Sequence, residues 1–216
     1  MKRKLFNRTD VTHFREMKSI LDRWRELVSE LARKWDGDDV PWWYRERTAV
    51  GLFAGAIWKY FRKGFALEEY TTDKKKSGGR RQGRGDIWFS LDGEKEFVAE
   101  AKLSEPSLNF RKPLRYKLKK LLGSARSDSK ESSRHGTKAQ RVGMMFVAPY
   151  SKSRPTSESI ARFIEELEKV SKSAARAWTF PEFSLESNCK EKGKIYYCPG
   201  IALLIKPVRH QNRKNS

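Results

Sequence analysis

The spacing of apolar positions predicts that the chain begins with a long helix over residues 9–35. Phe14, Met17 and Leu21 open an apolar seam that continues with alternating spacings of three and four residues, which is typical of one helix face. We favour the interpretation in which this seam packs on the chain's own domain. In the alternative, the 14–35 helix pairs two subunits as a short coiled coil and makes a homodimer.

A second helix is predicted over residues 43–61, where Val50, Phe53 and Ile57 share one face. Glu46 extends that face by one turn. A carboxylate in line with an apolar stripe lies either at the wet end of the stripe or in a polar pocket, because burial without a partner is costly. The helix dipole alone would also favour a glutamate in the first turn, so both interpretations stay open.

Strands follow these helices. Residues 65–72 are typical of a strand, and residues 85–91 and 95–103 form two more, joined at Asp92-Gly93, which is a strong hairpin signal. The remaining elements are expected as a helix, a strand, a helix and final strands, at residues 109–122, 142–148, 157–174 and 178–205.

This order of elements predicts an α/β fold with a mixed central sheet flanked by helices. A chain of 216 residues is long enough for one buried core, and 38% of its residues are hydrophobic. We therefore expect one domain at residues 41–216 with an N-terminal helical arm at residues 1–40.

The charge points to a polyanionic partner. The chain has 47 Lys and Arg against 27 Asp and Glu, a formal net charge of +20, and binding to phosphates releases condensed counterions. Nucleic acid, with DNA favoured, is the expected partner, although a ribosome-associated protein or one that binds an anionic membrane surface would show the same excess. The glycine-containing basic run at residues 74–84 predicts a mobile loop that contacts phosphates; the plainer alternative is a solvated charge run. The candidate nucleic-acid contacts, in this run and on the outer face of the helix after Asn109, are Lys74, Lys75, Lys76, Arg80, Arg81, Arg84, Arg111, Arg115 and Lys119.

Targeting and membrane signals are not found in the sequence. The N-terminal MKRKLFNRTD lacks an apolar core of signal-peptide length, and no apolar stretch is long enough to span a bilayer. We expect a cytoplasmic protein with no membrane partner.

The predicted hairpin carries the candidate chemistry. Side chains alternate between the faces of a strand, so Glu100 and Lys102 point to the same face, near Asp86 on the preceding strand. Two nearby carboxylates repel each other unless a cation neutralises them, and magnesium, or manganese, suits oxygen ligands. A metal held there would lower the pKa of a bound water, and the lysine would orient the nucleophile or stabilise negative charge.

The loop length decides whether this site can form. A strict two-residue turn at Asp92-Gly93 would place Asp86 opposite Ala99 and therefore on the face away from Glu100. We therefore predict an odd-length loop or a bulge in this hairpin.

This arrangement resembles the PD-(D/E)XK nuclease family, in which an aspartate on one hairpin strand and a D/E-x-K triplet on the next hold a metal. Asp86 corresponds to the first acid, Glu100 to the second and Lys102 to the lysine, while Gly85 stands in place of the motif's proline. The resemblance covers roughly residues 43–150.

The resemblance implies a restriction-endonuclease-like fold and a metal-dependent DNA endonuclease that hydrolyses phosphodiester bonds. Many members of the family add a glutamate from an earlier helix, which Glu46 matches. The implied catalytic residues are Asp86, Glu100, Lys102 and Glu46, and the implied metal ligands are Asp86, Glu100 and Ala101.

Two other functions compete with this hypothesis. A catalytically inactive nucleic-acid-binding protein on the same fold, such as an assembly or regulatory subunit, would bind DNA without magnesium and would not depend on Lys102. An RNA-binding or ribosome-associated basic factor is favoured by the charge and the aromatic residues alone.

Overall fold

A computed structural model describes residues 6–35, 37, 40–76, 79–133, 138–170 and 172–208. Its centre is an eight-stranded sheet in which β4 and β6 are parallel and the other pairs are antiparallel. In spatial order the strands are β1 (Asn7–Asp10), β7 (Ala175–Thr179), β10 (Ile201–Pro207), β6 (Gln140–Val147), β4 (Glu96–Ser104), β3 (Gly79–Ser90), β2 (Phe65–Lys76) and β5 (Ser132–Ser133). A separate hairpin consists of β8 (Asn188–Glu191) and β9 (Lys194–Tyr197).

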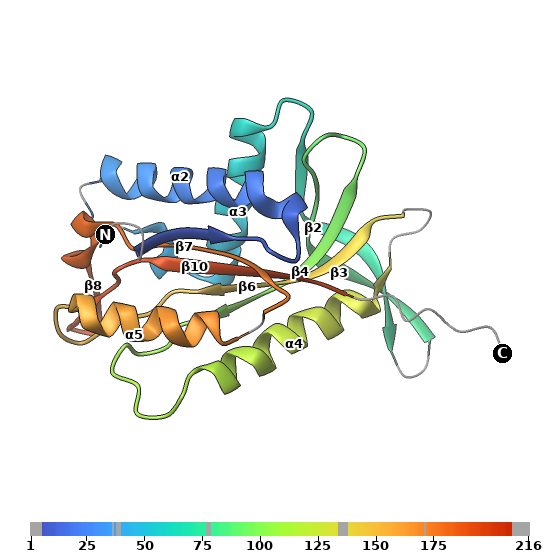
Figure 1. The fold of residues 1–216 in the computed structure, drawn as a ribbon. Coiled ribbons are helices and arrows are strands. Elements are labelled where there is room, and N and C mark those ends of the chain that lie inside the picture. The colour runs from blue at the N-terminus through green and yellow to red at the C-terminus, as the bar shows by residue number, and fades with distance from the viewer. Residues whose placement is uncertain are drawn as a thin grey trace.

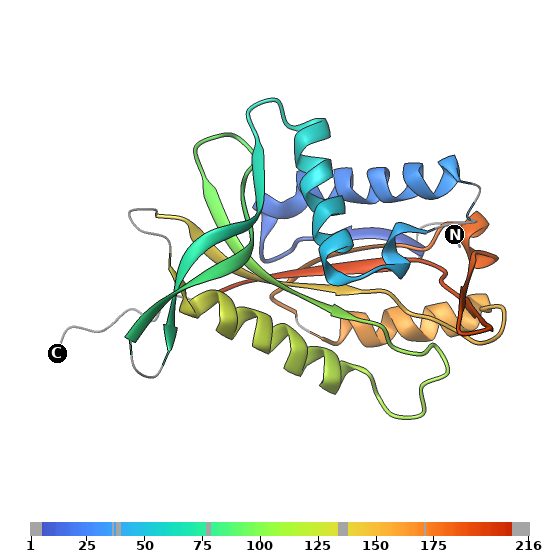
Figure 2. The ribbon, with the colours of Figure 1, turned by 180° about the vertical axis from the view of Figure 1, so that it is seen from behind.

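Helices cover both faces of the sheet (Figures 1 and 2). On one face lie α2 (Lys18–Lys34) and α3 (Glu46–Tyr60), and on the other lie α4 (Arg115–Glu131) and α5 (Ser157–Glu168). The predicted α/β class, with a mixed sheet and flanking helices, is confirmed. Short 3-10 turns complete the elements: η1 (Arg15–Met17), η2 (Pro41–Trp43) and η3 (Glu182–Leu185).

Two hydrophobic clusters fill the space between these layers. Strand side chains that point to one face, such as Phe89 and Ala101, join the cluster under α2 and α3, while Met145 and Leu204 join the cluster over α4 and α5. A two-sided core explains why β6 and β10 are continuous apolar runs rather than alternating ones. Among the described helices, none combines the length and the apolar character that crossing a bilayer requires.

The N-terminal segment differs from the predicted continuous helix. The α-helix begins at Lys18 rather than near residue 9, and the residues before it form β1, which pairs with β7 at the sheet edge. The apolar seam is buried within the chain, where Met17, Leu21 and Trp24 are fully inaccessible to solvent. This is the arrangement that we favoured from the sequence, in which the seam packs on the chain's own domain.

The helix after Asn109 is also shifted. It starts at Arg115 and continues to Glu131, through a serine-rich segment beyond the end of the helix predicted at residues 109–122. Its buried face is formed by Leu118, Leu122, Ala125 and Ser129. Small residues at the last two positions let the helix approach the sheet closely, and a polar composition hid this apolar periodicity in the sequence.

The sequence predicted a mobile loop at residues 74–84, but most of this basic run is strand. Strands β2 and β3 continue into it as a long twisted ribbon, which projects from the sheet in Figure 2, with Lys75 paired opposite Arg80. The connecting residues 77–78 lie outside the described residues. The prediction was wrong because like charges at paired positions disfavour a strand pair. The backbone pairing of β2 with β3 nevertheless extends from the sheet into the basic run.

Candidate active site

The hairpin register places Asp86 and Glu100 opposite each other. Strands β3 and β4 pair from Ile87 with Ala99 to Ser90 with Glu96, which leaves a five-residue loop at residues 91–95. Extending this register by one residue sets Asp86 against Glu100, on the same face of the sheet. The predicted odd-length loop is therefore confirmed.

The loop is held by its own polar groups. Asp92 accepts hydrogen bonds from the N–H groups of Glu94 and Lys95, both at 2.9 Å, and Gly93 adopts a left-handed φ of 81°. These bonds to the charged carboxylate lower the pKa of Asp92. A self-contained loop of this kind fixes the register of the two strands that lead to the site.

Asp86 lies at a break in the sheet. Neither β2 nor β4 pairs with it, although both pair with its neighbours Gly85 or Ile87. Opposite it on β2, Glu69 has a φ of 48°, in the left-handed region that non-glycine residues rarely adopt. Such strain is concentrated at functional sites in proteins, because surrounding structure must enforce it.

Beyond this break the edge of β4 is bonded by carboxylates instead of by β3. Asp86 Oδ2 accepts the N–H of Ala101 at 2.6 Å, and Glu46 Oε2 accepts the N–H of Leu103 at 2.8 Å. The N–H and C=O of one strand residue point to the same edge, so the Ala101 carbonyl also faces this side, between the two carboxylates. Oxygen atoms of Asp86, Glu46 and Ala101 therefore lie along this edge of β4.

The environment of Glu46 favours its neutral form. Burial raises the pKa of this carboxyl, and the charge of Asp86 raises it further, while Lys102 and the Leu103 N–H act in the opposite direction. The dependence on both Asp86 and Lys102 shows that these three groups lie within electrostatic reach of one another.

The side chains of Lys102 and Glu100 contact the C-terminal end of α4. Lys102 Nζ forms an ion pair with Asp128 at 3.0 Å, and Ser132 Oγ donates to Glu100 Oε1 at 2.6 Å. Burial lowers the pKa of Lys102, but the hydrogen bond and charge of Asp128, with Glu46 and Asp86, outweigh it and raise the pKa above the ordinary lysine value. Lys102 is therefore a charged ammonium in this structure.

The structure brings together only part of the predicted metal site. Asp86, Ala101 and Glu46 share one edge, whereas the buried Glu100 faces α4. Within the described ranges, no three Asp, Glu, His or Cys side chains converge as metal ligands. Magnesium keeps several water ligands and is often bound by one or two carboxylates, so the hard oxygen atoms along this edge fit that ion.

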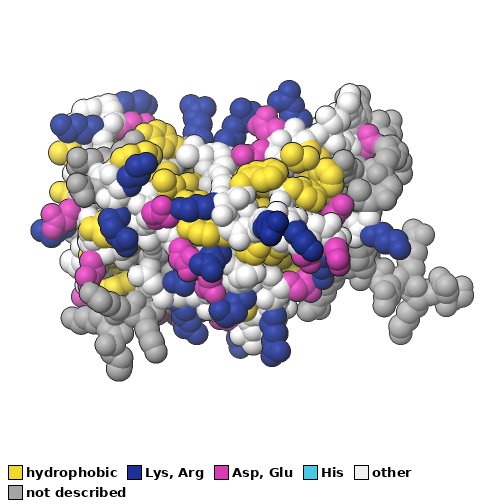
Figure 3. Space-filling view, turned by 90° about the horizontal axis from the view of Figure 1, so that it is seen from above, with side chains coloured by type: hydrophobic (Ala, Val, Ile, Leu, Met, Phe, Trp, Pro, Cys, Tyr) yellow, Lys and Arg dark blue, Asp and Glu magenta, His cyan; other side chains and the backbone are white. Residues whose placement is uncertain are grey.

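The predicted nucleic-acid contacts are in different environments. Arg111 and Lys119 are exposed, whereas Arg115 binds Glu166 at 2.7 Å and joins α4 to α5. Arg84 lies 3.2 Å from Glu69. The side chains of Lys74, Lys75, Lys76, Arg80 and Arg81 lie outside the described residues. Figure 3 shows the face over α2 and α3, where basic side chains are interspersed with acidic and apolar ones.

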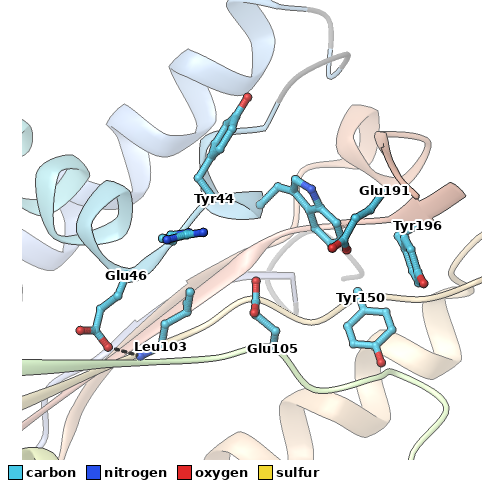
Figure 4. Close-up of a pocket in the computed structure, with 9 residues that line it drawn as sticks. Tyr44, Glu46, Leu103, Glu105, Tyr150, Glu191 and Tyr196 are labelled. Atoms are coloured by element: carbon cyan, nitrogen blue, oxygen red, sulfur yellow. Dashed lines mark hydrogen bonds between the residues drawn. The ribbon is translucent and has the colours of Figure 1, made fainter. Parts of the chain in front are cut away.

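A pocket opens beside Glu46 (Figure 4). Its volume is about 740 Å³, and its lining comes from η2, the start of α3, the end of β4 and the β8–β9 hairpin. Glu105 and Glu191 point into it, and Tyr150 and Tyr196 form one wall. No local sequence pattern indicates this pocket, because its lining residues are far apart along the chain.

The partners on α4 were also missed. Asp128 and Ser132 are separated by one helical turn, and both lie in the serine-rich segment that lacked a strong apolar pattern. The stripe of Leu118, Leu122 and Ala125 would have placed them on a helix if small residues had been counted as inward positions.

A stability measurement tests the environment of Glu46. A carboxyl whose pKa is raised by folding stabilises the fold when protonated, and this contribution is lost as the pH rises through the folded-state pKa. Glu46→Gln keeps an oxygen that can accept the Leu103 N–H but removes the charge. We expect the variant to be more stable than wild type in urea unfolding at about pH 8, and of similar stability at about pH 4.

The control for this comparison is Glu158→Gln, an exposed residue in the first turn of α5. It should not show the same gain at the higher pH. Equal stability of Glu46→Gln and wild type at both pH values would contradict a desolvated Glu46.

Comparison of the chain with protein-family models, with curated proteins and with solved structures finds no match.

Proposed function

We propose that the protein is a magnesium-dependent DNA endonuclease with a restriction-endonuclease-like fold of the PD-(D/E)XK type. The observation that carries the proposal is the edge of β4, where Asp86 and Glu46 flank the Ala101 carbonyl beside the charged Lys102. The order of elements from α3 to β6 supports it: the helix α3, the antiparallel meander β2–β3–β4, the helix α4, and then β6, which pairs parallel to β4.

Each residue of the edge has a role in this proposal. Asp86, Glu46 and the Ala101 carbonyl would hold the ion, which supplies an activated water and charge stabilisation for phosphodiester hydrolysis. Lys102 would leave Asp128 to contact the attacking water or a phosphate oxygen. Burial and the neighbouring Asp86 both raise the pKa of the Glu46 carboxyl, and a cation between the two carboxyls would offset this cost, which favours uptake of the ion with its substrate.

The basic ribbon would serve the same substrate. The backbone register pairs Lys74 with Arg81 and Lys75 with Arg80, and like charges at paired positions are unfavourable without an anion nearby. Phosphates would relieve this repulsion, so we expect binding to weaken steeply as salt is raised.

One observation favours the non-catalytic alternative. Lys102 and Glu100 are both hydrogen-bonded to residues at the end of α4, rather than directed to the edge that carries Asp86. In a nucleic-acid-binding protein without catalysis, these bonds would be permanent structural contacts.

Cleavage assays with Lys102→Ala decide between the two. We expect wild type to cut plasmid or single-stranded DNA only with magnesium, and Lys102→Ala to lose about two orders of magnitude in rate, as when one transition-state donor is removed. Lys172→Ala, which removes an exposed lysine after α5, is the charge-matched control and should cut normally. Unchanged cutting by Lys102→Ala would rule out the proposed centre, and magnesium-independent binding without cutting would favour the alternative.

A further inference from the structure

The pocket beside Glu46 has a composition unlike the rest of this basic chain. Half-buried aromatic rings line it together with the carboxylates of Glu46, Glu105 and Glu191. A phosphate would be repelled there, whereas a flat, uncharged ring with hydrogen-bond donors would be favoured. We propose that the pocket binds one unpaired nucleobase that carries an exocyclic amine, next to the phosphodiester at the candidate centre; the inference rests on the proposed function in taking nucleic acid as the substrate.

The aromatic wall is suited to stacking. The rings of Trp43 and Tyr196 are stacked with centroids 5.8 Å apart, and Tyr150 meets Tyr196 edge to face at 5.6 Å. Every base presents a π-face to such a surface, and base–aromatic stacking is a main source of affinity for unpaired strands. In a paired duplex those faces are covered by neighbouring bases, so the pocket selects a base that has left the stack.

The wall is already in place before any ligand arrives. The backbone of Ser151 exchanges two hydrogen bonds with Tyr197, at 2.9 and 2.8 Å, and this fixes the β8–β9 hairpin against the segment that carries Tyr150. Preformed contacts of this kind reduce the entropy that binding would otherwise cost.

The carboxylates select the base by its donors. Carboxylate oxygens accept hydrogen bonds, so Glu105 and Glu191 match the amine of cytosine or adenine and oppose the O4 atom of thymine. Partial burial raises the pKa of Glu105, and the nearby charge of Glu191 adds to this. The charges therefore lie close enough to act on one ligand.

The position of the pocket links it to the candidate centre. Glu46 and Leu103 belong to both, since they line the pocket and form the hydrogen bond at the edge of β4. The exposed Arg45 lies on the pocket rim, one residue before Glu46, where it can contact a phosphate between the two sites. A base in the pocket would therefore belong to a nucleotide adjacent to the scissile bond, and the substrate would be a single-stranded or locally opened one.

Binding without metal tests the pocket separately from catalysis. Labelled oligonucleotides dC12 and dT12, which carry equal charge and rings of equal size, are titrated with protein in EDTA and followed by fluorescence anisotropy. We expect dC12 to bind about tenfold more tightly than dT12, in line with the value of one good base contact. Glu105→Gln should reduce this preference, because its amide can donate to O4 as well as accept.

A second variant tests the stacking wall. Tyr150→Ala should weaken dC12 binding by about tenfold and leave binding of a 12-base-pair duplex unchanged. Trp58→Ala removes an exposed aromatic side chain near the other end of α3 and is the control, with no change in either affinity. Circular dichroism melting of each variant confirms that it is folded.

The outcomes separate this inference from the proposed nuclease. Equal affinity of wild type for dC12 and dT12, or equal loss of single-stranded and duplex binding in Tyr150→Ala, would overturn the pocket assignment even if magnesium-dependent cutting is found. If the binding pattern is found and Lys102→Ala cuts like wild type, the pocket assignment stands and the catalytic centre falls.

Discussion

Replacing Asp86 by asparagine is expected to abolish magnesium-dependent cleavage while the fold is retained. The asparagine amide can still accept the Ala101 N–H, which Asp86 accepts at 2.6 Å, so the local geometry has a replacement bond. The charge that would bind the ion is lost, and a metal contributes several kcal/mol to the transition state, which corresponds to a rate loss of about 10²- to 10³-fold or more.

Two measurements check this result. Calorimetry in the presence of non-cleavable DNA should show magnesium uptake by wild type but not by Asp86→Asn, and anisotropy should show that DNA binding without metal is equal or tighter in the variant. The control, Asp22→Asn, removes a partly buried carboxylate that pairs with Lys18 and Arg25 at the start of α2, and it should keep full activity. Undiminished ion uptake by Asp86→Asn would contradict the role of this edge.

The local features of the site could be predicted from the sequence because they depend on neighbours. Alternation along a strand places Glu100 and Lys102 on one face, and the requirement for a shared face predicted an odd-length loop, which is found at residues 91–95. The apolar spacing that predicted α3 likewise put Glu46 at the end of its stripe.

The contacts that complete the site could not be predicted in this way. The hydrogen bond from Leu103 to Glu46 joins residues 57 positions apart. It can form only because β4 does not pair with β3 beyond Ala99. Nothing in the local pattern indicates where a strand ladder ends. The exact direction of Glu100 similarly depends on Ser132, which no periodicity tied to β4.

The supports under Glu100 and Lys102 depend on how closely α4 approaches the sheet. Gly143 on β6 pairs with Glu100, and a Cβ built on Gly143 would lie 2.6 Å from the backbone nitrogen of Arg126. Real side chains essentially never come this close to backbone, so any larger residue forces the helix outward. Asp128 and Ser132 would move with it.

Gly143→Ala is therefore expected to destabilise the fold by about 1–3 kcal/mol and to lower the midpoint of thermal unfolding by several degrees. Gly123→Ala is the matched test, because Gly123 lies on α4 itself and a Cβ at this position would meet no neighbouring atom within 4 Å. Alanine there should stabilise the helix by about 0.5–1 kcal/mol. Urea unfolding of the two variants should thus give changes of opposite sign, and destabilisation of similar size by both would show that α4 is not held against β6 through Gly143. Displacing Asp128 would remove the main group that raises the pKa of Lys102, so we also expect Gly143→Ala to alter the pH dependence of any cleavage that relies on Lys102.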